Sequence, residues 1–211
     1  MDLVRASHLY KVFGKNERQV IERLKAGESR EELASLGTAA VIDVSFEVAK
    51  GETFVVMGLS GSGKSTLIRM INGLWSPSEG TVEVAGKVVS DMNDAQLRAL
   101  RRDHVSMVFQ HFALLPHLTV RENAAYGLKL QGKLKQKERL EKANEWLNTV
   151  GLNGWGDKYP HQLSGGMQQR VGLARALAAE TDILLMDEAF SALDPLIRRE
   201  MQDQLLELQG A

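Results

Sequence analysis

The sequence predicts an α/β fold with a mainly parallel sheet, an antiparallel β subdomain and a helical subdomain. Short apolar runs at 53–57 (TFVVM) and 183–186 (ILLM) have the composition of strands, the second of a strand buried on both faces. A helical pattern follows each run, and strands that alternate with helices are typical of a parallel sheet. The chain has 211 residues, which suffices for one ordinary domain with a hydrophobic core.

The composition excludes several classes of protein. Lys+Arg 26 and Asp+Glu 27 give a net charge of −1, which indicates no basic surface for nucleic acid. With no cysteine, a disulfide framework and a thiolate metal site are excluded. No apolar run approaches the roughly 18 residues of a membrane helix, so we expect a soluble chain that reaches a membrane only through a partner. The histidines show no metal-ligand spacing; they are His8, His104, His111, His117 and His161.

The first half of the chain predicts strands with helices between them. The expected strands are 3–13, 41–48, 53–57 and a hairpin at 81–90 with its turn near Ala85 and Gly86. Residues 15–38 predict two short helices, of which the first stops at Gly27 and the second starts with a capping box of Ser29 and Glu32. Another helix is expected at about 64–74.

The second half is mostly helical in pattern. A strand at 105–109 leads into Gln110, and Thr119 with Glu122 predicts the capped start of a helix. Gly151 predicts the end of the helix that follows. Later elements are expected at 137–150 (helix), 165–179 (helix) and 182–186 (strand). The last helix has an apolar face formed by Ile197, Met201, Leu205 and Leu208.

The stretch GLSGSGKS at 58–65 matches the phosphate-loop pattern G-x-x-x-x-G-K-[ST], between an apolar strand and a helix. Its glycines allow backbone N–H groups to surround a phosphate, and the helix N-terminus adds a positive dipole end. Lys64 suits the β- and γ-phosphates, and the Ser65 hydroxyl suits Mg²⁺. The alternative is a Gly/Ser-rich turn that happens to carry a lysine. The expected ATP-binding residues of this loop are Gly58, Leu59, Ser60, Gly61, Ser62, Gly63, Lys64, Ser65 and Thr66.

Two carboxylates follow the apolar run at 183–186. Open α/β sheets bind ligands at the carboxyl ends of their strands, where Asp187 and Glu188 are expected. Asp187 would hold Mg²⁺, and Glu188 would polarise the water that attacks the γ-phosphate. The alternative is a pair of acidic residues that complements a helix dipole. Together with the phosphate loop, the pair predicts a P-loop NTPase core.

Three further stretches make a family resemblance specific. LSGGMQQR at 163–170, Gln110 after a strand and SALD at 191–194 together resemble the ATP-binding cassette of ABC transporters, over essentially the whole chain. The stretches VFQHFALLPHLTVREN and YPHQLSGGMQQRVGLARALA, with the insert at about 15–38, are similar to the glycine betaine/proline (quaternary amine) uptake subfamily.

The resemblance implies roles for single residues. Phe13 would stack on adenine, with Tyr10 as the fallback and a core aromatic as the alternative. Gln110 would contact Mg²⁺ and the attacking water, against the alternative of a surface polar residue at a strand end. Asp194 would organise a dimer interface, against the alternative of a helix cap before Pro195. The catalytic residues would be Glu188, Lys64 and Gln110, and the Mg²⁺ ligands would be Ser65, Gln110 and Asp187.

The resemblance also implies partners. Two cassettes would pack head to tail, so that ATP on one phosphate loop is closed by Ser164, Gly165 and Gly166 of the other copy. The stretch HFALLPHL after Gln110 would dock a transmembrane permease, and its alternative is the core of the helical subdomain. An extracytoplasmic substrate-binding protein would act through the permease. The chain would thus lie at the cytoplasmic face of the inner or plasma membrane.

The expected organisation is a single nucleotide-binding domain over 1–211. It comprises the helical insert at 15–38, a RecA-like ATP-binding core at 50–110 and 180–211, and a helical signature subdomain at about 111–179. By resemblance, the family's switch histidine would follow one more strand, which leads us to expect a C-terminally truncated domain with impaired hydrolysis.

The sequence therefore predicts an ATPase subunit that powers osmolyte uptake. An importer of another substrate, such as an amino acid, and a non-transport ABC ATPase remain the alternatives. A nucleic-acid cassette ATPase would carry basic arms or coiled coils, and a small-molecule kinase would not require LSGG. A non-catalytic nucleotide sensor is disfavoured by Glu188.

Overall fold

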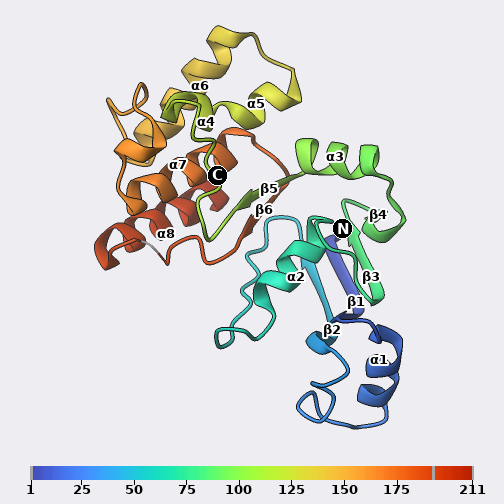
Figure 1. Ribbon diagram of the computed structural model, residues 1–211. Helices are drawn as coiled ribbons and strands as arrows, with labels where there is room; N and C mark the ends of the chain where they lie inside the picture. The colour runs from blue at the N-terminus through green and yellow to red at the C-terminus, as the bar shows by residue number, and fades with distance from the viewer. Residues whose placement is uncertain (1, 192, 211) are drawn as a thin grey trace. The chain divides into compact units, whose positions relative to one another are not determined.

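The computed structural model describes residues 2–191 and 193–210 and divides into two compact units, Met1–Arg98 and Ala99–Ala211. The first unit contains an antiparallel sheet in the order β2–β1–β3–β4 (Figure 1). Its strands are β1 (Asp2–Phe13), β2 (Thr38–Ala49), β3 (Glu79–Val84) and β4 (Lys87–Val88). The expected hairpin turn is confirmed, because Ala85 and Gly86 both have positive φ between β3 and β4, as a two-residue turn requires.

The insert at 15–38 forms one helix, α1 (Glu17–Lys25), and not two. Val20 and Ile21 of α1 and Leu33 are buried with Tyr10 and Val12 of β1. The predicted capping box is present, since the Ser29 N–H donates to Glu32 at 2.8 Å and the Glu32 N–H donates to the Ser29 hydroxyl at 3.3 Å. The prediction of a second helix is nevertheless wrong. Residues 30–36 form only a turn, and this segment is too short before Gly37 for helical hydrogen bonds to propagate.

The predicted strand at 53–57 is also wrong. No ladder among the described residues includes this segment, and Val55 and Met57 are 68% and 87% exposed. An apolar run has the capacity to form a strand, but a neighbouring strand must supply hydrogen-bond partners before one forms. The helix after the phosphate loop, α2 (Lys64–Ile71), is present and ends before Gly73, whose φ is 67°.

A short 3₁₀ turn, η1 (Val89–Asp91), leads to a helix that the apolar pattern does not predict, α3 (Asp94–Asp103). Its only buried residue is Leu100, so it carries little apolar periodicity. The available signal is at its start: the Asn93 N–H donates to the Gln96 side chain at 2.8 Å, and the Gln96 N–H donates to the Asn93 side chain at 3.0 Å.

The second unit contains two parallel strands, β5 (Val105–Val108) and β6 (Ile183–Met186). The predicted capping box of Thr119 and Glu122 is confirmed at the start of α4, and Gly151 has a φ of 71° after α6. The remaining elements are α4 (Val120–Ala124), α5 (Tyr126–Gln131), α6 (Gln136–Thr149), η2 (Pro160–Gln162), α7 (Gly165–Ala178) and α8 (Pro195–Gly210).

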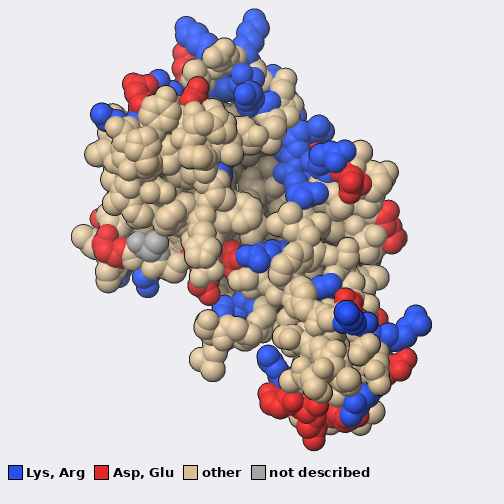
Figure 2. Space-filling view, viewed as in Figure 1, with Lys and Arg blue, Asp and Glu red and all other residues tan. Residues whose placement is uncertain are grey.

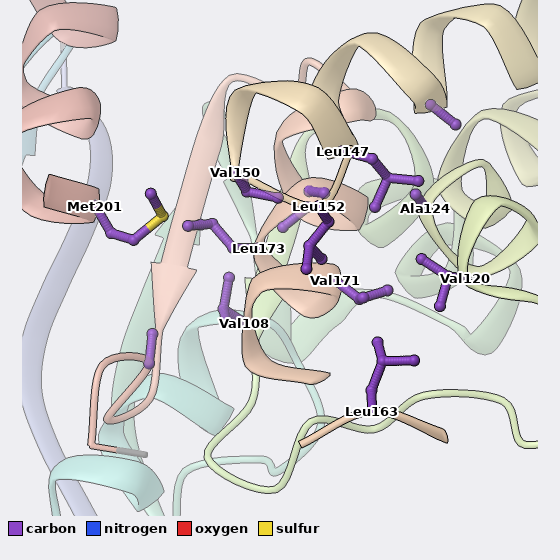
Figure 3. Packing of buried hydrophobic residues seen from close by; sticks show 14 of the residues in the cluster. Val108, Val120, Ala124, Leu147, Val150, Leu152, Leu163, Val171, Leu173 and Met201 are labelled. Carbon is purple, nitrogen blue, oxygen red and sulfur yellow. The ribbon is translucent and has the colours of Figure 1, made fainter. Parts of the chain in front are cut away.

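The core of the second unit forms between α6, α7 and the sheet. Figure 3 shows Leu147, Leu152 and Val171 close together in this cluster, and each is at most 1% exposed. Met201 of α8 belongs to the same cluster, and Ile197 and Leu205 pack against it as the helical spacing predicts. The side chain of Leu208 lies outside the described residues. This closely packed cluster fixes the positions of α7 and β5, and with them the positions of the residues at their ends.

Charged side chains of both signs are interspersed over much of the face in Figure 2, and acidic side chains gather at its lower end. Within the described residues, no helix has the length and apolar character needed to cross a membrane.

Candidate functional site

The phosphate loop requires glycine at its end for a steric reason. Gly63 is the N-cap of α2 at a φ of 93°, and a Cβ there would lie 2.0 Å from the carbonyl oxygen of Ala40. Gly61 has a φ of 78° with open space around it, and a Cβ at Gly58 would lie 2.6 Å from the Ser62 hydroxyl. The loop therefore takes a path that side chains would obstruct, as a backbone cradle for phosphate does.

The lysine of the loop is folded back onto it. Lys64 Nζ donates to the carbonyl oxygens of Gly58 and Leu59 at 3.0 and 2.9 Å. Residues 58–62 are exposed, and Lys64, Ser65 and Thr66 are half-buried. An ammonium group beside exposed backbone N–H groups and a helix N-terminus is a donor set that fits phosphate oxygens.

In the second unit, the register of the parallel strands brings two predicted residues together. Val108 pairs with Met186, so Gln110 and Glu188 each follow their strand by two residues. Gln110 Nε2 donates to Glu188 Oε2 at 2.8 Å. The Glu188 side chain is exposed, and its backbone has a φ of 49°, which non-glycine residues rarely adopt. An amide donor thus orients the carboxylate at the carboxyl edge of the sheet.

Asp187 lies at the same edge but in a different environment. Its residue is 1% exposed, and its N–H donates to the carbonyl of Val108 at 3.0 Å. A buried carboxylate on a residue whose backbone is bonded to the neighbouring strand, beside an exposed carboxylate, fits the separate roles of metal ligand and base. Within the residues that the structure describes, no group of three His, Asp or Glu side chains forms a metal cluster.

The signature loop forms a capped helix start. Ser164 is the N-cap of α7, and its hydroxyl accepts from the Met167 N–H at 3.3 Å. Ser164 and Gly165 are exposed and Gly166 is half-buried. A Cβ at Gly165 would lie 3.5 Å from the Phe112 ring, so the loop after Gln110 adjoins this helix start. Exposed N–H groups at the N-terminus of a 14-residue helix fit an anion.

The two aromatic candidates for adenine differ in exposure. Tyr10 is 5% exposed within the core beside α1, whereas Phe13 is 37% exposed. The Phe13 ring makes an edge-on contact with Trp75 at 4.8 Å between centroids, and Lys11 Nζ lies 5.3 Å from it. Only Phe13 of the two presents a ring that a base can reach. Trp75 was not predicted, since a single tryptophan in a loop carries no periodic signal.

Asp194 acts as the helix cap that the sequence left as an alternative. Its Oδ1 accepts from the N–H groups of Leu196 and Ile197, each at 3.1 Å, at the start of α8. Two more side chains that were not predicted, Gln169 and Arg175 of α7, contact carbonyl oxygens on either side of Gln110. Polar residues inside an otherwise apolar helix are the signal that identifies them.

The chain belongs to the ABC transporter family, whose sequence profile matches residues 41–191. Among curated relatives, the glycine betaine transport ATP-binding protein OpuAA of Bacillus subtilis is 55% identical over 97% of this chain and 49% of its own length. The glycine betaine/proline betaine transport system ATP-binding protein ProV of Escherichia coli is 52% identical over 96% of this chain and 51% of its own length. The chain therefore spans about half the length of these relatives.

A solved structure confirms the fold class. A dimeric ATP-binding cassette in a post-hydrolysis state, bound to ADP and Pi, superposes with a TM-score of 0.85 at 33% sequence identity. The match covers 98% of this chain and 82% of that one. The predicted P-loop NTPase cassette with antiparallel, parallel and helical parts is thus the observed fold.

Proposed function

We propose that the chain is the ATP-binding and ATP-hydrolysing subunit of a transporter that takes up a small osmolyte of the glycine betaine or proline type. The observation that carries hydrolysis is the 2.8 Å hydrogen bond from Gln110 to Glu188 at the carboxyl edge of β5 and β6. A carboxylate oriented by an amide is suited to accept a proton from an attacking water. The osmolyte class is supported by the relatives, which are named for glycine betaine transport at 52–55% identity.

The phosphates of ATP would be bound by residues 58–66. Backbone N–H groups of the loop would donate to the phosphate oxygens. Lys64 Nζ would donate to them as well, in place of the carbonyls of Gly58 and Leu59 that it contacts now. Ser65, Asp187 and Gln110 would hold Mg²⁺, which supplies charge neutralisation to the phosphates when bound. Phe13, the exposed aromatic, would stack on adenine.

The catalytic step would consist of positioning and charge stabilisation. Glu188 would accept a proton from the water whose oxygen attacks the γ-phosphorus, and the bond to the β,γ-bridging oxygen would break. Gln110 would orient that water through its side-chain amide. Lys64 would stabilise the negative charge that develops on the leaving phosphate oxygens.

Two copies would share their sites. The exposed Ser164 and Gly165, with Gly166, would close on the ATP bound to the phosphate loop of the other copy. The dimeric relative bound to ADP and Pi supports this arrangement. The exposed His111 and Ala113 and their neighbours in the stretch after Gln110 would contact a permease, and a substrate-binding protein would deliver the osmolyte.

The test is ATP turnover and uptake of labelled osmolyte in membranes that contain the chain with its permease. Glu188→Gln should abolish both, and Asp182→Asn is the matched control, since Asp182 is an exposed carboxylate beside β6 that pairs with His104 at 2.6 Å. Unlabelled glycine betaine should compete with uptake. Competition by an amino acid such as methionine and not by glycine betaine would overturn the substrate class. Full turnover by Glu188→Gln would overturn the assignment of the base.

A further inference from the structure

The loop that follows Gln110 has a strained backbone. Phe112 and Ala113 have φ values of 37° and 48°, in the left-handed region. For residues with a Cβ this conformation is unfavourable, so surrounding contacts must hold it in place. Ala113 is exposed and Phe112 is half-buried, which leaves few apolar contacts of their own for this purpose.

Arg175 of α7 supplies the missing contacts. One guanidinium nitrogen, Nη1, donates to the carbonyl of Ala113 at 2.7 Å, and Nη2 donates to the carbonyl of Phe112 at 3.1 Å. The planar fork of arginine suits two consecutive carbonyls, and charge-assisted bonds are stronger than neutral ones. Burial lowers the pKa of Arg175, because the guanidinium has lost water that these carbonyls replace.

The same helix also contacts the chain before Gln110. Gln169 is 2% exposed, and its Nε2 donates to the carbonyl of Phe109 at 3.4 Å. At the start of α7, the Phe112 ring adjoins Gly165. Gln110 therefore lies between two backbone segments that are both attached to α7, and its own side chain reaches Glu188.

We propose that Arg175 is a positioning residue, which holds residues 111–113 on α7 and thereby keeps the Gln110 amide on Glu188. Arg175 contacts neither ATP nor water in this role. A consequence is that any displacement of the loop after Gln110 moves the signature loop at the other end of α7, since both are attached to one rigid helix. The effect on hydrolysis rests on the proposed function, whereas the hold on residues 111–113 does not.

The direct test is hydrogen exchange of the full chain, with peptides that cover 109–118. Arg175→Gln should raise the exchange rate there about tenfold or more, because two charge-assisted bonds to carbonyls are lost. Arg170→Gln is the matched control: it lies on the same helix, and its Nη1 donates to the carbonyls of Val150 and Gly151 at 3.2 and 3.3 Å. The Arg170→Gln protein should show a higher hydrogen-exchange rate near 150–152 and an unchanged rate at 109–118.

Unchanged exchange at 109–118 in a folded Arg175→Gln protein would overturn the proposal, and so would an equal rise in the Arg170→Gln protein. If Arg175→Gln does not fold, Arg175→Lys is measured in its place, since lysine keeps the positive charge and lacks the planar guanidinium that donates to two carbonyls. Arg175→Lys should show a smaller rise confined to the same peptides. A rise spread over the whole second unit would indicate a purely structural role and would refute the inference.

The kinetic test separates positioning from binding. For Arg175→Gln, kcat for ATP should fall about tenfold while the affinity for ATP changes less than about twofold, because the residue acts through Gln110. Arg175→Lys should recover part of kcat. A loss of ATP affinity that matches the loss of kcat would overturn the link to Gln110. Should the unmodified protein neither bind nor hydrolyse ATP, the proposed function fails, and the exchange result alone decides the inference.

Discussion

Replacing Gly63 by alanine tests the phosphate loop most sharply. The loop offers a matched control in Gly61, which also has a positive φ, 78° against 93° for Gly63. The two positions differ in their surroundings. A Cβ at Gly61 meets nothing within 4 Å, whereas a Cβ at Gly63 lies 2.0 Å from the carbonyl oxygen of Ala40. Comparison of the two variants thus isolates the steric contact from the backbone strain.

The expected magnitudes follow from these distances. Alanine in the left-handed region costs about 1–2 kcal/mol, so Gly61→Ala should weaken ATP binding about tenfold. At Gly63, the Ala40 carbonyl must also retreat by about 1 Å to reach the shortest separation that real Cβ atoms show. A misplacement of about 1 Å in a preorganised site costs about a hundredfold. Gly63→Ala should therefore weaken binding about a thousandfold.

The assay is calorimetric titration of each variant with ATP and Mg²⁺. Thermal unfolding of the unliganded proteins shows whether the variants remain folded. Losses of affinity that agree within about threefold, in two folded variants, would refute the steric argument. If Gly63→Ala loses ATP affinity and its unfolding temperature also falls steeply, Ala40 and the sheet are displaced, and not the loop alone.

Four further predictions concern the other site residues and one helix cap. Glu188→Gln should trap an ATP-bound dimer, because ATP binds but the proton acceptor is absent; sedimentation that shows only monomer with ATP and Mg²⁺ would contradict this. Phe13→Ala should weaken ATP binding by about 1–3 kcal/mol through lost stacking on the base, measured by titration, whereas Tyr10→Leu, which also removes a ring, should not; equal losses would contradict the choice of Phe13. Thr119→Ala should lower the free energy of unfolding by about 1 kcal/mol through the lost cap, measured by urea unfolding. Hydrogen bonds from Thr119, first of all its backbone N–H, lower the pKa of Glu122. This carboxylate therefore stabilises the fold above its pKa in the unfolded chain, and the contribution is lost as the pH falls through the lower pKa of the folded state. The stability difference between the unmodified protein and Glu122→Gln should therefore vanish in acid; a difference that persists at pH 2 would contradict it.

Local signals predicted much of the fold. The cap at Thr119, the turn at Ala85 and the stop at Gly151 are confirmed, because each depends on hydrogen bonds or φ values within a few residues. The second helix of the insert is wrong despite its capping box. A cap alone does not offset the cost of nucleating a helix.

Features that depend on contacts between distant segments were harder to predict from the sequence. The run at 53–57 was predicted as a strand from composition, yet its Val55 and Met57 are exposed and no described strand pairs with it. Helix α3 was missed because only Leu100 is buried on it. In both cases the outcome depends on which other segment packs against the element, and apolar periodicity reports capacity for packing and not the partner.

By itself, the sequence determined the chemistry of the candidate site: the phosphate loop with Lys64, the carboxylates Asp187 and Glu188, and the signature loop at Ser164. These depend on residue types at short spacing, which the chain carries locally. Tertiary structure alone decided that Gln110 meets Glu188 across 78 residues, because the register of two parallel strands sets that contact. It also decided that Arg175 holds the loop after Gln110, since the packing of α7 against β5 determines which carbonyls the guanidinium can reach.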